Sequence, residues 1–472
     1  MRYAVLACLC LLIFAGVSTA QIQRDRTASY VNQQRQVEEE VRQQLDRDLP
    51  LTQKVLFDWG GWFGSYLFMF DDAIKNRTLR RQDVRLWGSL NADQGIHQAY
   101  IRLKFSYDDF NHNDSYTGND DDFEGPNLDR GWYQLDLAKL LRKHGGVDLP
   151  IDLSVKAGRD YVMFGTGYAL SMPLDAVQIT TGLGDIKIDT LLGKTISSYD
   201  NLDTSRPDPS RSDRCFYGVQ ARYTGFQKHE PFIYYFEQND RQHDGWPFLW
   251  KQKWDYDSKY LGFGSTGEIT PTLRYSGEFV FQQGRSYADK QWTGTEPIDA
   301  YGWDLELIYT PRWSTRPKFS LEYMFAGGDA DRLLSPTNSV IGNLAGTTDK
   351  SFNAFGYRNT GLALAPDLSN LHIWRLGGSF FPLDKHSNDW LKKLELGTDF
   401  FLYHKNRTAA AISDPFANTA HGFVGWEMDY YINWRLTSDL SWTIRYGIFF
   451  PGSAYTNEES RNFFLTGFTW SF

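Results

Sequence analysis

The most regular feature of this chain is an alternation of apolar and polar residues that recurs along most of its length. Residues 440–450 show it clearly, and their apolar positions are Leu440, Trp442, Ile444, Tyr446, Ile448 and Phe450. The positions between them are Ser441, Thr443, Arg445, Gly447 and Phe449. Because successive side chains of a strand point to opposite faces, a period of two predicts strands with one apolar and one polar face.

A soluble β-sandwich also alternates, so strand length and the residues at strand ends have to decide between it and a membrane barrel. The alternating segments span about 10 to 14 residues, whereas strands of soluble proteins are mostly about 5 to 6 residues long. Their apolar faces often begin and end with Trp, Tyr or Phe, as the interfacial girdles of a membrane barrel require. In lipid every backbone polar group must be paired within the protein, so the sheet has to close. The pattern therefore predicts an all-β, transmembrane antiparallel β-barrel.

Counting the alternating segments gives about eighteen strands, an even number as in single-chain bacterial barrels. We expect them at 55–70, 80–90, 98–108, 131–138, 150–160, 174–180, 184–195, 215–224, 231–240, 256–266, 271–284, 300–310, 317–327, 371–382, 392–404, 423–436, 440–450 and 461–472. Connections after odd-numbered strands are long and those after even-numbered strands are mostly short. The expected long connections are 109–130, 196–214, 241–255, 285–299, 328–370, 405–422 and 451–460. Because outer loops are long and periplasmic turns short, both termini should lie in the periplasm.

The two ends of the chain differ from the body. Residues 1–20 combine Arg2, an apolar run and a small-residue stretch ending at Ala20, which predicts a cleaved signal peptide rather than an uncleaved anchor. We expect residues 21–50 to form an N-terminal segment in the periplasm. Within 28–49 apolar residues recur every fourth position, which predicts a short helix. That helix is either a frayed tail or a segment that docks on the barrel or on a periplasmic protein partner. The barrel then occupies 51–472, and its last strand ends on Phe472, which resembles the signal read by the barrel insertion machinery.

Composition supports the same fold. Trp, Tyr and Phe number 16, 27 and 33, although only 41% of the residues are hydrophobic. Alternation explains both values, because each strand averages to polar while the girdles need aromatic residues. Of three cysteines, Cys8 and Cys10 lie in the predicted signal peptide, so Cys215 has no partner for an intrachain disulfide. The net charge is −9, and we expect outer-membrane lipid but no nucleic acid among the partners.

Charged residues in phase with the polar face are the candidate functional residues. The basic ones, expected to guide an anion, are Arg85, Arg102, Lys104, Lys156, Arg159, Arg222, Arg274, Arg375, Arg435, Arg445 and Arg461. Among them Arg159 joins this face only if a bulge re-aims it. Closure makes the first and last strands neighbours, so we expect one basic wall formed by Arg85, Arg102, Lys104, Arg435, Arg445 and Arg461.

The polar face also carries acidic candidates, and those of strands 11 to 15 should lie largely opposite that wall. The acidic candidates are Glu278, Asp304, Glu306, Glu322, Asp399, Glu427 and Asp429. A wide lumen with a basic wall would guide anions, and arginine can grip a carboxylate through two hydrogen bonds. The alternative for each residue is that Arg and Glu pair across neighbouring strands and stiffen the wall.

Five short segments resemble a known family. Residues 425–431 (GWEMDYY) with 444–452 (IRYGIFFPG) are similar to the C-terminal region of alginate-export outer-membrane porins. Lys156 to Asp160, the GTG of 165–167, and 326–329 (AGGD) also resemble segments of that family. The resemblance implies an eighteen-stranded barrel whose Arg-lined constriction passes an anionic polysaccharide, with Arg159, Arg445 and Arg461 in or near matching segments. A general or sugar-selective porin, or a channel for a small anion, is the alternative.

Other kinds of site have weaker support. The chain has no Gly-x-Ser-x-Gly or His-Glu-x-x-His motif, so we expect neither an enzyme nor a cofactor. The acidic run 119–124 lacks the ligand spacing of a calcium loop, so a solvated loop is favoured over a metal site.

Overall fold

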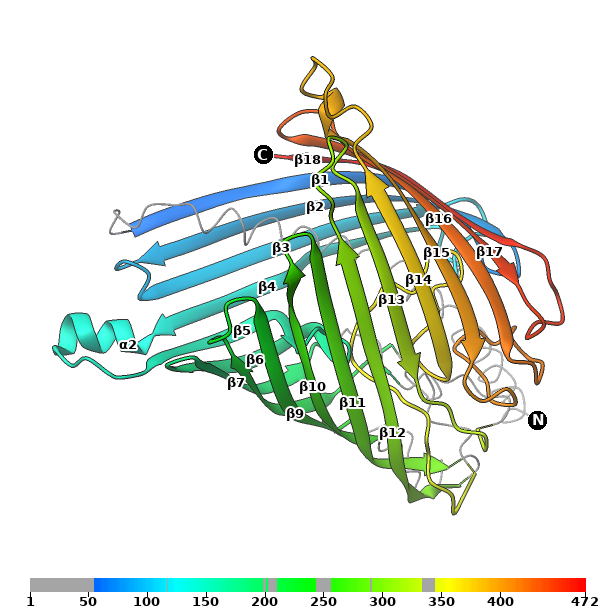
Figure 1. Ribbon diagram of the computed structural model, residues 1–472, viewed down its shortest axis with the longest axis horizontal. Helices are drawn as coiled ribbons and strands as arrows, with labels where there is room; N and C mark the ends of the chain where they lie inside the picture. The colour runs from blue at the N-terminus through cyan, green and yellow to red at the C-terminus, as the bar shows by residue number, and fades with distance from the viewer. Residues whose placement is uncertain are drawn as a thin grey trace, which may run out of the picture.

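Each strand of this protein pairs with its sequence neighbours, and β1 also pairs with β18, so that eighteen antiparallel strands close into a barrel (Figure 1). The computed structural model describes residues 55–116, 118–197, 201–202, 210–242, 256–288, 291–332 and 344–472. The predicted signal peptide at 1–20 and the predicted N-terminal segment at 21–50 lie outside the described residues. The predicted fold class and number of strands are confirmed.

The strands follow the chain around the ring in numerical order. They are β1 (Val55–Asp71), β2 (Asn76–Ala92), β3 (His97–Phe110), β4 (Asp121–Asp136), β5 (Asp152–Phe164), β6 (Leu170–Leu183), β7 (Ile186–Thr195), β8 (Arg214–Tyr223), β9 (His229–Asp240), β10 (Asp257–Thr270), β11 (Leu273–Ala288), β12 (Gln291–Tyr309), β13 (Lys318–Ala326), β14 (Leu371–Phe380), β15 (Leu394–Lys405), β16 (Phe423–Arg435), β17 (Leu440–Pro451) and β18 (Arg461–Ser471).

Two of the expected long loops are largely strand. The hairpin of β3 and β4 uses much of 109–130, including part of the acidic run, and β11 and β12 extend across most of 285–299. Strand ends that project beyond lipid need no apolar face, so their sequences do not alternate and periodicity misses them.

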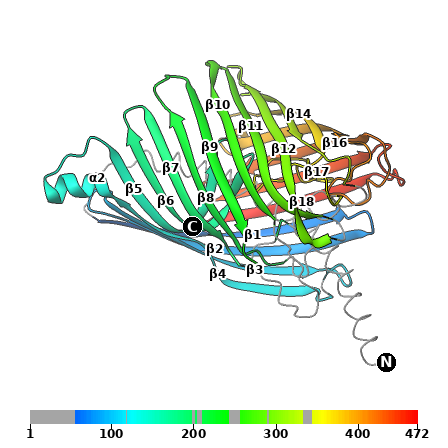
Figure 2. The same cartoon turned by 90° about the horizontal axis from the view of Figure 1, so that it is seen from below.

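The two ends of the barrel differ in their connections. The turn end, where β1 begins and β18 ends, has short connections such as 93–96, 184–185, 271–272 and 436–439. It also carries α2 (Leu137–Leu140) with η2 (Leu141–Gly145), and η3 (Leu391–Lys393). The opposite loop end has the longer connections, of which 327–370 is the longest, and Figure 2 shows the ring from a second direction.

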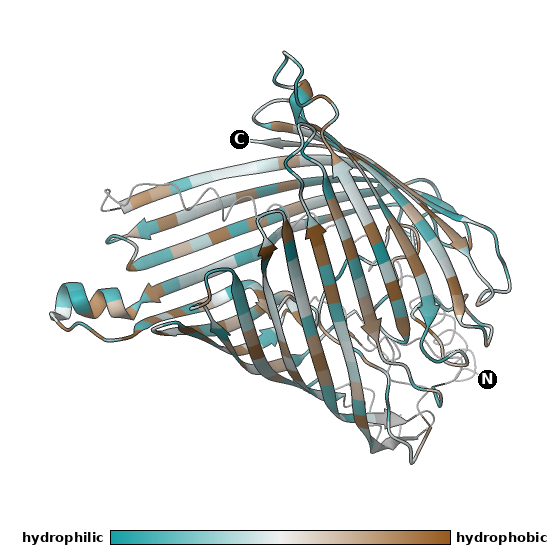
Figure 3. Ribbon diagram, viewed as in Figure 1, coloured by the Kyte–Doolittle hydropathy of each residue, from teal (hydrophilic) through white to brown (hydrophobic). Residues whose placement is uncertain are grey.

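The outward face is apolar and aromatic. Trp59, Trp374 and Phe468 alternate with inward residues and remain exposed, as expected for a surface that contacts lipid. Figure 3 shows the alternation as brown and teal bands along the strands and mostly teal connections.

No helix among the described residues is long and apolar enough to cross a membrane.

Two clusters of buried apolar side chains occupy the interior. The first draws its buried strand residues from β5 to β13, with Phe352 and Phe355 of the 327–370 connection. The second draws them from β1, β2 and β13 to β18, with Leu362, Ala363 and Leu364 of the same connection. Among the described residues, β3 and β4 are the strands that contribute no buried side chain to either cluster.

Candidate solute pathway inside the barrel

The strand register brings basic side chains together on the inner faces of β2 to β5. Lys104 on β3 lies opposite Arg85 on β2, and Arg102 lies opposite Arg130 on β4. Lys156 follows on β5, opposite Gln134 of β4. We call these five residues, Arg85, Lys104, Arg102, Arg130 and Lys156, the basic arc.

Carboxylates balance part of the charge of the basic arc. Arg102 Nε lies 2.6 Å from Asp129 Oδ2, and Lys156 Nζ lies 2.6 Å from Asp160 Oδ2. Arg130 Nη1 is 3.6 Å from Asp160, and Arg85 Nη2 is 3.8 Å from Asp83. Three carboxylates, Asp83, Asp129 and Asp160, therefore lie among the cations of the arc.

Aromatic rings on the same faces support the basic arc. The guanidinium carbons of Arg85 and Arg102 lie 5.5 Å and 5.4 Å from the ring centre of Trp62 on β1. Lys156 Nζ lies 5.2 Å from the ring centre of Trp132. Such cation–π contacts favour one position of a long, flexible side chain, so the rings help to keep the cations on the inner face.

Residues 344–370 of the 327–370 connection enter the barrel, and we call them the crossing segment. It can be followed as the yellow coil behind β13 and β14 in Figure 1. At one wall, the Phe355 N–H donates to Ala169 O at 2.9 Å and Phe355 O accepts from the Ser171 N–H at 2.9 Å. A Cβ on Gly356 would lie 1.7 Å from Tyr168 O, so only glycine allows this close approach.

Arg358 fixes the crossing segment to the acidic strands. Its Nε donates to Asp304 Oδ2 at 2.7 Å and lies 3.9 Å from Glu322 Oε1. Its other nitrogens donate to the carbonyl and hydroxyl oxygens of Thr166. The Thr166 hydroxyl in turn donates to Glu278 at 2.6 Å, so one arginine joins three acidic side chains of β11 to β13.

At the other wall, two carboxylates of β16 hold the same segment. Glu427 accepts from the backbone N–H groups of Leu362, Ala363 and Leu364 at 2.6, 2.7 and 2.8 Å. Asp429 also accepts from the Leu362 N–H, at 3.1 Å. Gly361 has a φ of +110°, which turns the chain so that these amides face Glu427.

The crossing segment therefore spans the barrel. Its contacts on β6 and on β16 are eight strands apart along the shorter path around the ring of eighteen. The acidic residues Glu278, Asp304, Glu322, Glu427 and Asp429 all lie at its two attachments. The basic arc lies on the inner wall between these attachments, on the side of β1 to β5.

Three of the predicted basic residues pair across strands, as the alternative interpretation expected. Arg375 donates to Asp399 and Glu322, both at 2.9 Å, and Glu306 lies opposite Glu322 on the same inner face. Arg222 Nη2 is 2.7 Å from Asp189, and Arg274 Nη2 is 3.0 Å from Glu268. These arginines stiffen the wall on which they lie.

The expected six-residue basic wall is wrong in part. Arg435 ends β16 at the turn end, whereas Arg461 begins β18 at the loop end, so the length of the barrel separates them. Arg461 pairs there with Asp414, and Arg445 lies over the ring of Tyr431 at 5.3 Å. The compact basic cluster is the basic arc, which extends to β4 and β5 instead of back to β16.

The expectation that Arg159 joins the inner face is also wrong. The register between β5 and β6 runs without a bulge, so Arg159 lies opposite Asp175 on the outward face. Arg159 Nε and Nη2 donate to the two oxygens of Asp175 at 2.7 Å and 3.0 Å.

Sequence reasoning missed two residues of this site. Arg130 precedes the predicted start of its strand, and register shifts in β4 interrupt the alternation there. Its alternation with Gly131 and Trp132 could have shown that it faces inward. Arg358 lies in a connection without periodicity, and no signal in the sequence pointed to it. Within the described ranges, no group of three or more His, Cys, Asp or Glu side chains could hold a metal ion.

The fold is that of an outer-membrane porin. The barrel is similar to crystal structures of Pseudomonas aeruginosa OccK8 (OprE), with a TM-score of 0.56 and 11% identity, and OccK5 (OpdH), with 0.54 and 12%. Acinetobacter baumannii OccAB2 gives a TM-score of 0.53 at 10% identity. Each alignment covers 88% of this chain and 98% of the other. At such low identity the similarity concerns the fold alone.

The family follows from the sequence. The alginate export family matches residues 199–464, which is more than half of the chain, and the protein belongs to that family. A comparison with curated protein sequences finds no match. Family and fold are those of outer-membrane porin channels.

Proposed function

We propose that this protein passes an anionic solute, and foremost an anionic polysaccharide, along the basic arc. The observation that carries the proposal is the distribution of apolar and basic side chains around the interior. Every described strand except β3 and β4 contributes a buried side chain to an apolar cluster, and β3 touches one only through the partly buried Phe110 at its loop end. These two strands carry Arg102, Lys104 and Arg130 on their inner faces. A solute that follows the inner wall there meets cations instead of apolar packing.

Charge geometry favours an anion along this path. The crossing segment engages the carboxylates of β11 to β13 and β16, so those acids lie within its attachments. Cations that line a confined path raise the local concentration of anions, and arginine binds carboxylates with two parallel hydrogen bonds.

Membership of the alginate export family supports a polymer of uronic acids as the solute. The aromatic rings of Trp62, Trp87 and Trp132 lie among the cations of the arc, and their flat apolar faces suit the faces of sugar rings. A general or sugar-selective porin is the competing function, and it would need neither the cations nor a preference for charged sugars.

The experiment compares block of single channels in planar bilayers by two oligosaccharides of similar length. We expect oligogalacturonate, which is anionic, to block the current, and a neutral malto-oligosaccharide to block it far less. Equal block by both would favour a sugar-selective porin, and no block by either would favour a general porin. Replacing Arg102 and Arg130 with Gln should weaken the block by oligogalacturonate, while replacing the exposed Arg274 should leave it unchanged.

We further propose that the barrel lies in the outer membrane with its turn end in the periplasm. Short periplasmic turns and long outer loops are the rule for such barrels. A cysteine placed at Ser453, in the β17–β18 connection, should react with a membrane-impermeant maleimide on intact cells. A cysteine at Ser438, in the β16–β17 turn, should react only after the outer membrane is opened. The reverse pattern would overturn this orientation.

A further inference from the structure

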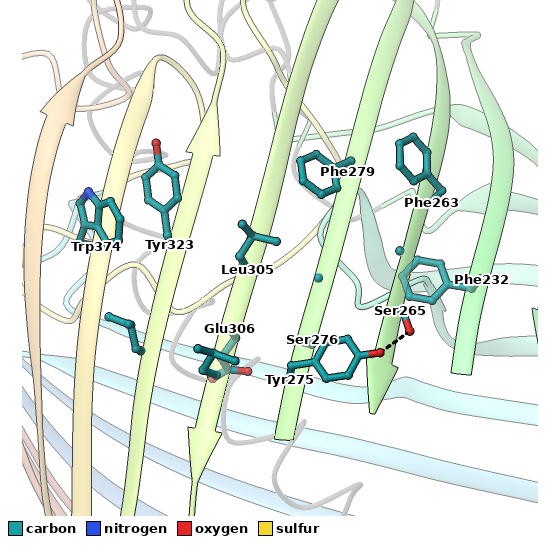
Figure 4. Close-up of a pocket in the computed structure, with 14 residues that line it drawn as sticks. Phe232, Phe263, Ser265, Tyr275, Ser276, Phe279, Leu305, Glu306, Tyr323 and Trp374 are labelled. Atoms are coloured by element: carbon teal, nitrogen blue, oxygen red, sulfur yellow. Dashed lines mark hydrogen bonds between the residues drawn. The ribbon is translucent and has the colours of Figure 1, made fainter. Parts of the chain in front are cut away.

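The outward face over β10 to β14 carries an apolar groove that the solute pathway does not use (Figure 4). Its volume is about 730 Å³. Outward side chains that line it include Phe263, Phe279, Leu305, Leu321 and Trp374. A barrel wall that contacts lipid need only be apolar, so a concave site on it requires its own explanation.

The groove exists because one outward position lacks a side chain. Gly277 lies on β11 between the outward residues Tyr275 and Phe279. A Cβ there would approach Leu305 Cδ2 to 3.2 Å, so even a methyl group would begin to fill the floor. The Tyr275 hydroxyl forms a hydrogen bond with Ser265 Oγ at 2.8 Å, which is the dashed line in Figure 4. A ligand in the groove therefore does not have to supply a hydrogen-bond partner for this hydroxyl.

An exposed cation follows β12 at the turn end. Arg312, in the β12–β13 connection at the turn end, is exposed and has no ion-pair partner among the described residues. Beside it Trp313 is 61% exposed, as an interfacial anchor would be.

The depth of the groove fits one leaflet. Leu305 precedes Arg312 by seven residues, which is at most about 23 Å of chain at ~3.3 Å per residue. A strand tilt of 35–45° reduces this to roughly 17 Å across the membrane. One leaflet of a ~30 Å hydrocarbon core is about 15 Å thick. An acyl chain lying in the groove would therefore place its headgroup close to Arg312.

We propose that this groove is a binding site for an anionic phospholipid of the periplasmic leaflet. One acyl chain lies over Gly277, and the phosphate pairs with Arg312. Arginine suits this role because its planar guanidinium matches phosphate oxygens. The site is independent of the proposed solute pathway, which runs inside the barrel on other strands.

Native mass spectrometry of the purified full chain, titrated with phosphatidylglycerol, tests the proposal. Arg312→Gln removes the cation and should weaken binding on the order of tenfold, the loss expected for one charged hydrogen bond. Gly277→Leu fills the groove and should weaken binding by displacing the acyl chain. Gly88→Leu is the matched control for Gly277→Leu, because Gly88 also faces outward and a Cβ there meets nothing closer than 3.8 Å. Arg142→Gln is the control for Arg312→Gln, because Arg142 is another arginine at the turn end and pairs with Asp148.

Specific outcomes would overturn the proposal. Equal phosphatidylglycerol binding by all four variants would show that no such site exists. Binding of lipid A in preference to phosphatidylglycerol would place the site in the other leaflet. A dimer of the wild-type chain that Gly277→Leu dissociates would show that a second copy occupies the groove.

Discussion

Glu427 on β16 accepts a hydrogen bond from the backbone N–H of Ala363, 2.7 Å away, although Ala363 belongs to a connection that leaves the ring between β13 and β14. The same carboxylate binds the amides of Leu362 and Leu364. A strand of one wall thus holds a segment whose other attachment is on β6, across the barrel.

Replacing Glu427 with Gln should loosen the crossing segment. Gln keeps one of the two oxygens and replaces the other with an amide nitrogen that cannot accept a hydrogen bond. Oε1 accepts from Leu362 and Ala363 and Oε2 from Leu364, so at least one buried N–H group would lose its acceptor, at a cost of about 1–3 kcal/mol. We expect single-channel currents to become larger and noisier. Glu395→Gln is the control, because Glu395 lies on β15 and accepts from Asn433. Identical current noise in both variants would mean that Glu427 does not hold the segment in the open channel.

Replacing Arg358 with Met should destabilise the barrel strongly. It leaves the buried Asp304 without its cation, and breaking a buried ion pair from one side costs about 3–5 kcal/mol. Arg274→Gln should cost at most about 1 kcal/mol, because its pair with Glu268 is exposed. Urea unfolding in micelles measures both variants. Adding Asp304→Asn to Arg358→Met should recover part of the loss, and no recovery would show that the charge of Asp304 is not the cause.

The outward pair of Arg159 and Asp175 should behave as a coupled unit. Each single change to Leu leaves one charge on the lipid-facing wall, whereas the double change leaves none. We therefore expect the double variant to be more stable than either single variant, with a coupling energy of about 1 kcal/mol or more. Additive losses in a double-mutant cycle would instead mean that each side chain is solvated independently.

A pH-dependent contact should join two connections at the turn end. Hydrogen bonds from His144, foremost, and from Lys143 lower the pKa of Asp93 to about 2. Because the folded pKa lies below the unfolded value of about 3.9, this contact stabilises the fold above pH 4 and is lost as pH falls through 2. A carbon-13 titration of the Asp93 carboxyl should report the low pKa. His144→Ala should raise it, and an unchanged pKa in that variant would contradict this account.

Alternation was sufficient to predict the ring and the phase of most inward residues. Arg102 and Glu427 lie on the predicted face because a period of two leaves only two choices for a side chain. Arg159 is three residues from Lys156, so it needs a bulge to face the same way, and β5 has none there.

The crossing segment could not be predicted from periodicity. Phe352 and Leu364 are buried in it, yet the backbone around them pairs with side chains and loops instead of a regular strand. Local sequence carries no period in such a segment, so neither its inward path nor the role of Arg358 was visible. Alternation predicted that Glu278 and Glu427 face inward. It could not predict their partners, because these lie in segments without a period.

The reversal potential in a salt gradient across a planar bilayer tests the central claim most directly. The wild-type channel should prefer anions, and Arg102→Gln with Arg130→Gln should shift the preference towards cations, because Asp129 and Asp160 lose positively charged partners. The matched control replaces two outward arginines, Arg80 and Arg159, with Gln in the same way. These arginines pair with Asp109 and Asp175 outside the lumen, so the control should leave the reversal potential unchanged. A wild-type channel that prefers cations, or an inward double variant with an unchanged reversal potential, would contradict the account.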